Sequence, residues 1–143
     1  MRIRRLTVAI VVVSIAFGTS GCMSVAKALA GHPVAGYGID QDLADWMRCD
    51  LEETKRRGEE FKQQSYASGG RGYLVPSVGD SGCDVLAKLG RPDDIRSVST
   101  ENDTYFNLLY HTGSTQTYDY KAHQVTLVMN QMLNGLVATS VVW

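Results

Sequence analysis

The stretch Val78–Pro92, VGDSGCDVLAKLGRP, predicts a short helix with a defined start and end. Ser81 is placed as the N-cap, and Asp84, three residues later, completes a capping box and faces the positive end of the helix dipole. Gly90 follows as the C-terminal cap, and Pro92 prevents continuation. Helices shorter than about 12–15 residues are marginal in water on their own. This helix therefore has to be held by packing of its apolar face against the rest of the domain.

The first 21 residues have the pattern of a signal peptide. Three arginines precede the apolar run Leu6–Phe17, which is too short to span a bilayer core of about 30 Å. The run is followed by Gly21-Cys22, which resembles a bacterial lipoprotein lipobox, although Thr19 stands where leucine is usual. The resemblance implies removal of residues 1–21 and acylation of Cys22. Ordinary secretion with cleavage after Ala30 and an uncleaved membrane anchor are the alternatives.

Acylation at Cys22 would attach the protein to membrane lipid, with residues 22–39, rich in Gly, Ala and Val, as the tether. In lipoproteins of this type an aspartate after the acylated cysteine retains the protein at the inner membrane. Met23 occupies that position here, so the resemblance implies an outer-membrane lipoprotein facing the periplasm, in an organism that has an outer membrane.

Length and charge limit the remaining chain to one small domain without a nucleic-acid partner. The 143-residue chain has a net charge of −1. Its sequence contains no block of basic residues and no interleaving of basic and aromatic residues, which nucleic-acid binding would need. Removal of the leader leaves about 120 residues, which is the size of a single domain. We therefore expect one folded unit over residues 40–143.

Two cysteines remain if Cys22 is lipidated. An even pair in an oxidising compartment favours a disulfide between Cys49 and Cys83. Two free thiols are one alternative. The other is a reactive thiol at Cys83, because a helix N-terminus lowers the pKa of a nearby thiol.

A second helix is predicted over residues 40–63, with Asp40 or Asp42 as its cap. One broad face of this helix carries Leu43, Met47, Leu51, Thr54 and Phe61. Gly58 costs the helix about 1 kcal/mol relative to alanine. The glycine-rich loop that follows, Ser68–Gly72, lacks the Lys-Ser/Thr of a phosphate-binding loop, so we interpret it as a connection only.

Three strands are predicted after the helix of Val78–Pro92. They cover Tyr105–Tyr110, Gln124–Leu133 and Leu136–Trp143. Asn134-Gly135 predicts a two-residue hairpin turn that places Leu133 opposite Leu136 and Met129 opposite Ser140. Residues Asp93–Thr104 and His111–Ala122 are polar and are predicted as loops. The fold class is therefore α+β, with two helices packed on one face of a three-stranded antiparallel sheet in the order ααβββ.

The predicted hairpin register divides the sheet residues into two faces. The face expected to carry the helices contains Val125, Leu127, Met129, Leu133, Leu136, Ala138 and Val142. The other face is mixed, and its apolar members form the candidate partner face: Val128, Met132, Val137, Val141 and Trp143. An exposed apolar patch commonly meets a partner, so a protein partner in the envelope is one expectation for this face. Cover by the N-terminal tether or the glycine-rich loop is the alternative.

The run from Gly79 through Leu89-Gly90 and Pro92, followed by an aromatic strand and the Asn-Gly turn, resembles the SmpA/OmlA (BamE) family of small outer-membrane lipoproteins. The similarity covers residues 78–143. It implies helices against a three-stranded antiparallel sheet and a non-enzymatic accessory role in outer-membrane barrel assembly. Domains of the β-lactamase-inhibitor type share the outline, so an envelope inhibitor or ligand-binding domain is the alternative function. The long helix before residue 78 departs from the family pattern.

No catalytic, cofactor or metal pattern stands out in the sequence. His32, His111 and His123 lack the spacing of zinc ligands, and no CxxC is present. A thiol hydrolase built from Cys83, His123 and Asp119 is conceivable, since such groups need only meet in space. We interpret these residues instead as surface histidines and a structural cysteine, and we predict a non-enzymatic protein without a cofactor.

Overall fold

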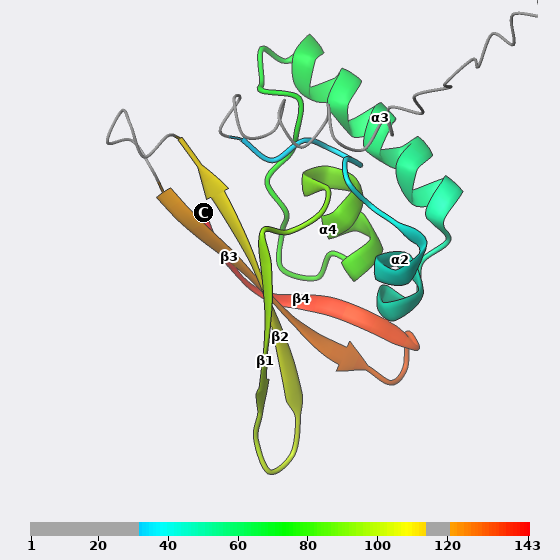
Figure 1. Ribbon diagram of the computed structural model, residues 1–143, viewed down its shortest axis with the longest axis vertical. Helices are drawn as coiled ribbons and strands as arrows, with labels where there is room; N and C mark the ends of the chain where they lie inside the picture. The colour runs from blue at the N-terminus through cyan, green and yellow to red at the C-terminus, as the bar shows by residue number, and fades with distance from the viewer. Residues whose placement is uncertain (1–31, 114–120) are drawn as a thin grey trace, which may run out of the picture.

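The computed structural model describes residues 32–113 and 121–143, which form three helices and a four-stranded antiparallel sheet. The elements are α2 (Gln41–Met47), α3 (Leu51–Ala67), α4 (Gly82–Leu89), β1 (Asp94–Ser99), β2 (Thr104–Thr112), β3 (Lys121–Asn130) and β4 (Gly135–Val142), with strand order β1-β2-β3-β4. Figure 1 shows the helices on one side of the sheet and the β1–β2 hairpin projecting beyond them. The α+β class is confirmed, whereas the predicted number of strands is one too few.

The helix predicted from Val78–Pro92 is α4, and it lies between α3 and the sheet (Figure 1). The Ser81 hydroxyl accepts a hydrogen bond from the Asp84 N–H at 3.1 Å, as expected for an N-cap. Gly90 ends the helix with φ +73°, and a Cβ there would lie 2.6 Å from the Tyr37 carbonyl oxygen. Only glycine fits this position, because it allows both the positive φ and the close approach.

The helix predicted over residues 40–63 is in fact two helices. Asp40 caps α2 as predicted, accepting from the Leu43 N–H at 2.9 Å. Arg48 then adopts a left-handed conformation with φ +57°, and Asp50 caps α3 by accepting from the Glu53 N–H at 2.7 Å. Because one continuous helix was predicted over residues 40–63, the role of Asp50 as a cap was missed. The break between α2 and α3 places Cys49 outside both helices.

Gly58 lies where α3 meets the chain that precedes α2. A Cβ on Gly58 would be 2.5 Å from the Gly36 Cα and 3.1 Å from the Ala87 carbonyl oxygen of α4. The glycine that weakens the helix is therefore the one that lets three segments approach closely. Ala35 and Ile39 are buried here as well. Residues 32–39 thus belong to the folded domain, which corrects their assignment to the tether, while 22–31 lie outside the described residues.

Strand β1 was predicted as part of a polar loop over Asp93–Thr104. It pairs antiparallel with β2, from Asp94 opposite Leu109 to Ser99 opposite Thr104. All six of its residues are exposed, so burial imposes no hydrophobic alternation on its sequence. This is why the strand carries no period-two signal.

The β3–β4 hairpin has a different register from the predicted one. Asn130 pairs with Gly135 and Met129 pairs with Leu136, so the turn contains four residues rather than two. The Asn130 side-chain oxygen accepts from the N–H groups of Met132 and Leu133, at 3.0 and 3.1 Å. Asn130 therefore begins the turn through its own side chain, and this local bonding outweighs the Asn-Gly signal.

A bulge in β4 changes which residues face the helices. Thr126 pairs with Ser140 and Leu127 pairs with Ala138, so Thr139 is an extra residue on β4. Beyond the bulge Val141, opposite Val125, faces the core, and Val142 is 59% exposed. The predicted core face is thus wrong for Val142 and for Leu133, which lies in the turn and is 69% exposed.

One hydrophobic core lies between the helices and the sheet. From the sheet it takes residues of β2, β3 and β4, and from the helical layer it takes residues of α2 and α4 together with Ile39 and Cys49. The sheet members are Leu108, Tyr110, Val125, Leu127, Leu136 and Ala138, and the helix members are Leu43, Ala44, Met47, Val85, Leu86 and Leu89.

Candidate functional site

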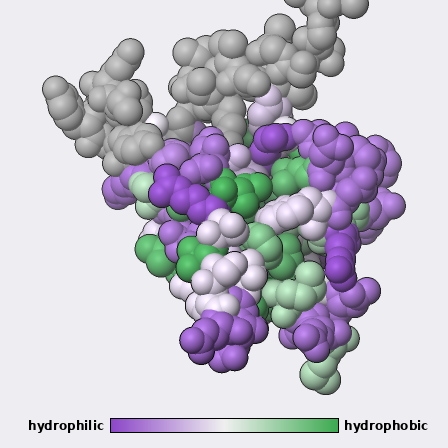
Figure 2. Space-filling model, turned by 60° about the horizontal axis from the view of Figure 1, so that its bottom comes forward, coloured by the Kyte–Doolittle hydropathy of each residue, from purple (hydrophilic) through white to green (hydrophobic). Residues whose placement is uncertain are grey.

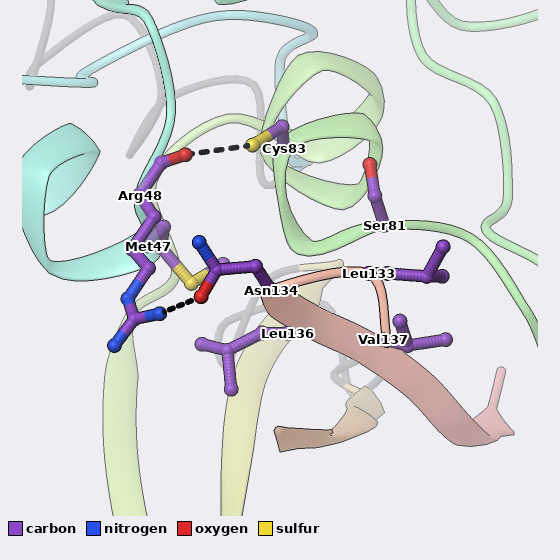
Figure 3. Close-up of a pocket in the computed structure, with 9 residues that line it drawn as sticks. Met47, Arg48, Ser81, Cys83, Leu133, Asn134, Leu136 and Val137 are labelled. Atoms are coloured by element: carbon purple, nitrogen blue, oxygen red, sulfur yellow. Dashed lines mark hydrogen bonds between the residues drawn. The ribbon is translucent and has the colours of Figure 1, made fainter. Parts of the chain in front are cut away.

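Cys49 and Cys83 are joined in the structure, with their Cα atoms 5.6 Å apart and a sequence separation of 34 residues. The bond connects the α2–α3 junction to the first turn of α4. The predicted pairing is therefore present, and in this state Cys83 has no thiolate with which to attack a substrate. The Cys83 sulfur also lies 3.9 Å from the Arg48 carbonyl oxygen (Figure 3).

A shallow pocket of about 150 Å³ lies beside this disulfide (Figure 3). It is lined by Met47, Arg48, Ser81, Cys83, Leu133, Asn134, Gly135, Leu136 and Val137. The Arg48 guanidinium reaches across the pocket and donates to the Asn134 side-chain oxygen. This bond links the end of α2 to the β3–β4 turn. Because the Arg48 guanidinium is already engaged with Asn134, the pocket is poorly suited to holding a charged ligand.

The sheet face away from the helices carries a continuous line of apolar side chains. Val98, Tyr105, Val128 and Val137 lie directly opposite one another on β1, β2, β3 and β4, and we call these four residues the apolar row. The helices cover the opposite face, which contains the buried Leu108 and Leu127. Val98 is 49% exposed, so the row reaches the surface at the sheet edge.

The structure divides the predicted partner face. Val128 and Val137 lie on the open face as expected. Met132 is fully exposed in the turn, whereas Val141 and Trp143 pack against the core from the helix side. Grouping these two residues with the open face was wrong, because the Thr139 bulge reverses the alternation.

Further apolar surface lies near the β1–β2 hairpin. Figure 2 shows hydrophobic residues gathered in the middle of the face seen from the bottom of Figure 1, between hydrophilic groups. The Trp46 and Phe106 rings pack edge to face, with centroids 4.9 Å apart, and Trp46 remains 40% exposed. Ile95 and Val98 of β1 are also exposed. Sequence reasoning missed β1 as a source of surface residues, and the Ile-x-x-Val spacing was too weak a signal to reveal it.

The two histidines of the sheet, His111 and His123, lie on opposite faces. The interpretation of His123 as a surface histidine was wrong, because the residue is buried. Its ring stacks on Trp143 at a centroid distance of 4.2 Å, and one ring nitrogen is 2.8 Å from the Thr112 hydroxyl. Burial lowers the pKa of His123, and electrostatic interactions with Lys121 and His111 lower it further. His111 lies on the open face and its Nδ1 is 3.2 Å from Asp93 Oδ2.

The residues of the thiol-hydrolase alternative are not brought together by the described part of the chain. Cys83 lies at the start of α4, His123 lies in the core face of β3, and Asp119 is outside the described residues. Cys22 is outside them as well. In residues 32–113 and 121–143, no group of three or more His, Cys, Asp or Glu could hold a metal ion. Over the same ranges, no helix combines the length and the hydropathy that a bilayer crossing requires.

No family model, curated protein or solved structure matches this chain. The resemblance to the SmpA/OmlA family therefore stays a prediction.

Proposed function

We propose that this chain is a non-enzymatic, lipid-anchored binding or scaffold protein of the bacterial cell envelope, attached to the outer membrane through Cys22. The observation that carries the proposal is the bond between Cys49 and Cys83. Disulfides persist in oxidising compartments such as the periplasm. A disulfide-bonded domain that follows a signal-like leader ending in Gly21-Cys22 fits a protein that is exported and then acylated.

The arrangement of layers also supports a role resembling that of the SmpA/OmlA family, as an accessory of barrel assembly. Helices cover one face of the antiparallel sheet, and the other face presents the apolar row to solvent. An open sheet face of this kind offers a partner a surface without requiring the domain to unfold. The apolar row is therefore our candidate contact surface for an envelope protein.

The anchor is tested by metabolic labelling with radioactive palmitate. The wild-type chain should incorporate label and sediment with outer-membrane vesicles, and Cys22→Ser should lose both properties. Cys49→Ser is the matched control, because it removes a different cysteine and should keep the label. Absence of fatty acid from the mature wild-type protein would overturn the anchor.

The contact surface is tested by site-specific photo-crosslinking in intact cells. A photoreactive phenylalanine analogue at Tyr105, in the apolar row, should crosslink to a subunit of the barrel-assembly machinery. The same analogue at Tyr66, exposed on α3, is the control and should not. A crosslink from Tyr105 to a soluble hydrolase would instead indicate the inhibitor-like alternative, and crosslinks from Tyr66 alone would rule out the open face as the contact surface.

A further inference from the structure

The two edges of the sheet differ in whether their backbone groups are used. At the β4 edge, Ala138 donates to the Asp80 carbonyl and accepts from the Gly79 N–H, both at 2.8 Å. Ser81 forms a further bridge with Val137. The loop before α4 therefore covers the middle of this edge, as natural sheets commonly require.

The β1 edge is uncovered among the described residues. The Thr100 N–H donates to the Asp103 carbonyl at 2.8 Å and closes the β1–β2 turn. Hydrogen-bonded and non-hydrogen-bonded pairs alternate from that point along an antiparallel ladder. The N–H and C=O groups of Ser99, Ser97 and Ile95 therefore point away from β2. The Ile95 N–H confirms this direction, since it is engaged by the neighbouring Asp94 carboxylate at 2.9 Å.

We propose that β1 pairs with β1 of a second copy of this chain, antiparallel and about a two-fold axis at Ser97, so that the sheet continues through the dimer. This register pairs Ser97 with Ser97 of the second copy and Ile95 with Ser99 in both directions. The outward-facing groups of Ser97 and Ser99 and the Ile95 carbonyl then gain partners, and the Ile95 N–H exchanges its bond to Asp94 for one to Ser99 of the second copy. An exposed edge without proline, lysine or a covering segment is a template for such pairing.

The charges of β1 favour this register over its neighbour. With the axis at Ser97, Arg96 lies opposite Val98 of the second copy, and Asp94 lies opposite Thr100. Shifting the axis to Arg96 would place the two guanidinium groups directly opposite each other, which is destabilising. Arg96 is also bonded to Asp94 in its own strand, at 2.9 Å, so each charge enters the interface already neutralised.

Figure 1 shows that the β1–β2 hairpin extends beyond the helices, so the helical layers of two copies need not collide. A pair of six-residue strands buries little surface compared with the roughly 1,200–2,000 Å² of a stable interface, so we expect a weak dimer. The inference does not depend on lipid attachment, because β1 lies within the folded domain.

Sedimentation analysis of the processed full-length chain, in detergent if it carries lipid, tests the dimer over concentrations from about 10 μM to about 1 mM. Ser97→Pro removes one outward N–H and no bond to β2, and proline is tolerated where the N–H of an edge strand faces solvent. We expect it to weaken dimerisation about tenfold or more, since two interface bonds are lost across the axis. Ser97→Ala keeps the N–H and should dimerise like the wild type.

Disulfide trapping gives a second readout that does not require proline to fold into the strand. Ser97→Cys should form a covalent dimer under mild oxidation, because the two-fold axis brings the two positions together. Ser99→Cys is the matched control on the same edge and should remain monomeric. A monomer throughout the concentration range, a dimer that survives Ser97→Pro, or equal trapping at both positions would overturn the proposal. The result of the palmitate experiment bears on none of these outcomes.

Discussion

The Tyr110 hydroxyl donates a hydrogen bond to the Gly90 carbonyl at 2.9 Å and joins the sheet to the end of α4. Tyr110 is completely buried, which raises the pKa of its phenol because the phenolate would be desolvated. The Gly90 carbonyl is buried with it, at the position where the helix can no longer use that group. This bond therefore holds α4 in register with β2.

Replacing Tyr110 by phenylalanine should lower the free energy of unfolding by about 1–3 kcal/mol, because a buried acceptor is left without its donor. Urea unfolding followed by circular dichroism measures the change. Tyr105→Phe, on the open face, is the control and should change stability by less than about 0.5 kcal/mol. Equal effects of the two substitutions would mean that the Gly90 bond contributes nothing specific.

The disulfide should contribute about 3–4 kcal/mol to stability, because it closes a 34-residue separation in the unfolded chain. Unfolding of the oxidised protein should be compared with that of the Cys49→Ala/Cys83→Ala double variant. Thiol alkylation and mass spectrometry of the native protein should label neither cysteine. Labelling of both residues in the folded wild type would show that they are free thiols.

Val141 and Val142 are adjacent residues on opposite faces of β4 and test the bulge. Val141→Asp should destabilise the domain by about 2–4 kcal/mol, because the carboxylate would enter the core beside Val125. Val142→Asp places the same charge in solvent and should cost less than about 1 kcal/mol. If Val142→Asp lowered the midpoint of thermal unfolding more than Val141→Asp, Val142 would face the core, as in the register predicted from the Asn-Gly turn.

Gly58→Ala should destabilise the protein even though alanine is the better helix former by about 1 kcal/mol. The added Cβ would meet the backbone at Gly36 and force α3 away from it. Gln64→Ala, exposed on the same helix, should leave the midpoint of thermal unfolding nearly unchanged. A raised midpoint for Gly58→Ala would show that helix propensity outweighs the contact.

His123 should make stability depend on pH. Its pKa is lowered in the folded state, chiefly by burial, so the unfolded chain binds a proton more readily. Its contribution is fully present above the unfolded pKa of about 6.5 and is lost as the pH falls through the folded pKa. Urea unfolding between pH 7.5 and 5 measures the slope. His123→Gln, which does not titrate, should show a shallower slope, and identical slopes would exclude this histidine as the cause.

How well the sequence predicted each element depended on whether its signal was local. The Ser81 cap and the Gly90 stop define α4 within a few residues, and both were predicted correctly. Strand β1 was missed because a strand exposed on both faces needs no apolar alternation. The sheet face on which Val141 lies depends on the bulge at Thr139. That bulge arises from the pairing of β4 with β3, and no turn motif in the sequence indicates it. The pairing of Cys49 with Cys83 followed from counting the cysteines, but the position of Cys49 between α2 and α3 depends on Arg48, whose left-handed conformation ends α2.

Both cysteines of the cross-link precede every strand of the sheet in the chain. In the export that we propose for this chain, the helical half would reach the oxidising compartment before β1 leaves the translocation channel. Oxidation can therefore fix the junction of α2 and α3 to α4 first, and the strands are then added to a preformed helical layer. The chain order therefore allows the cross-link to form before the sheet does.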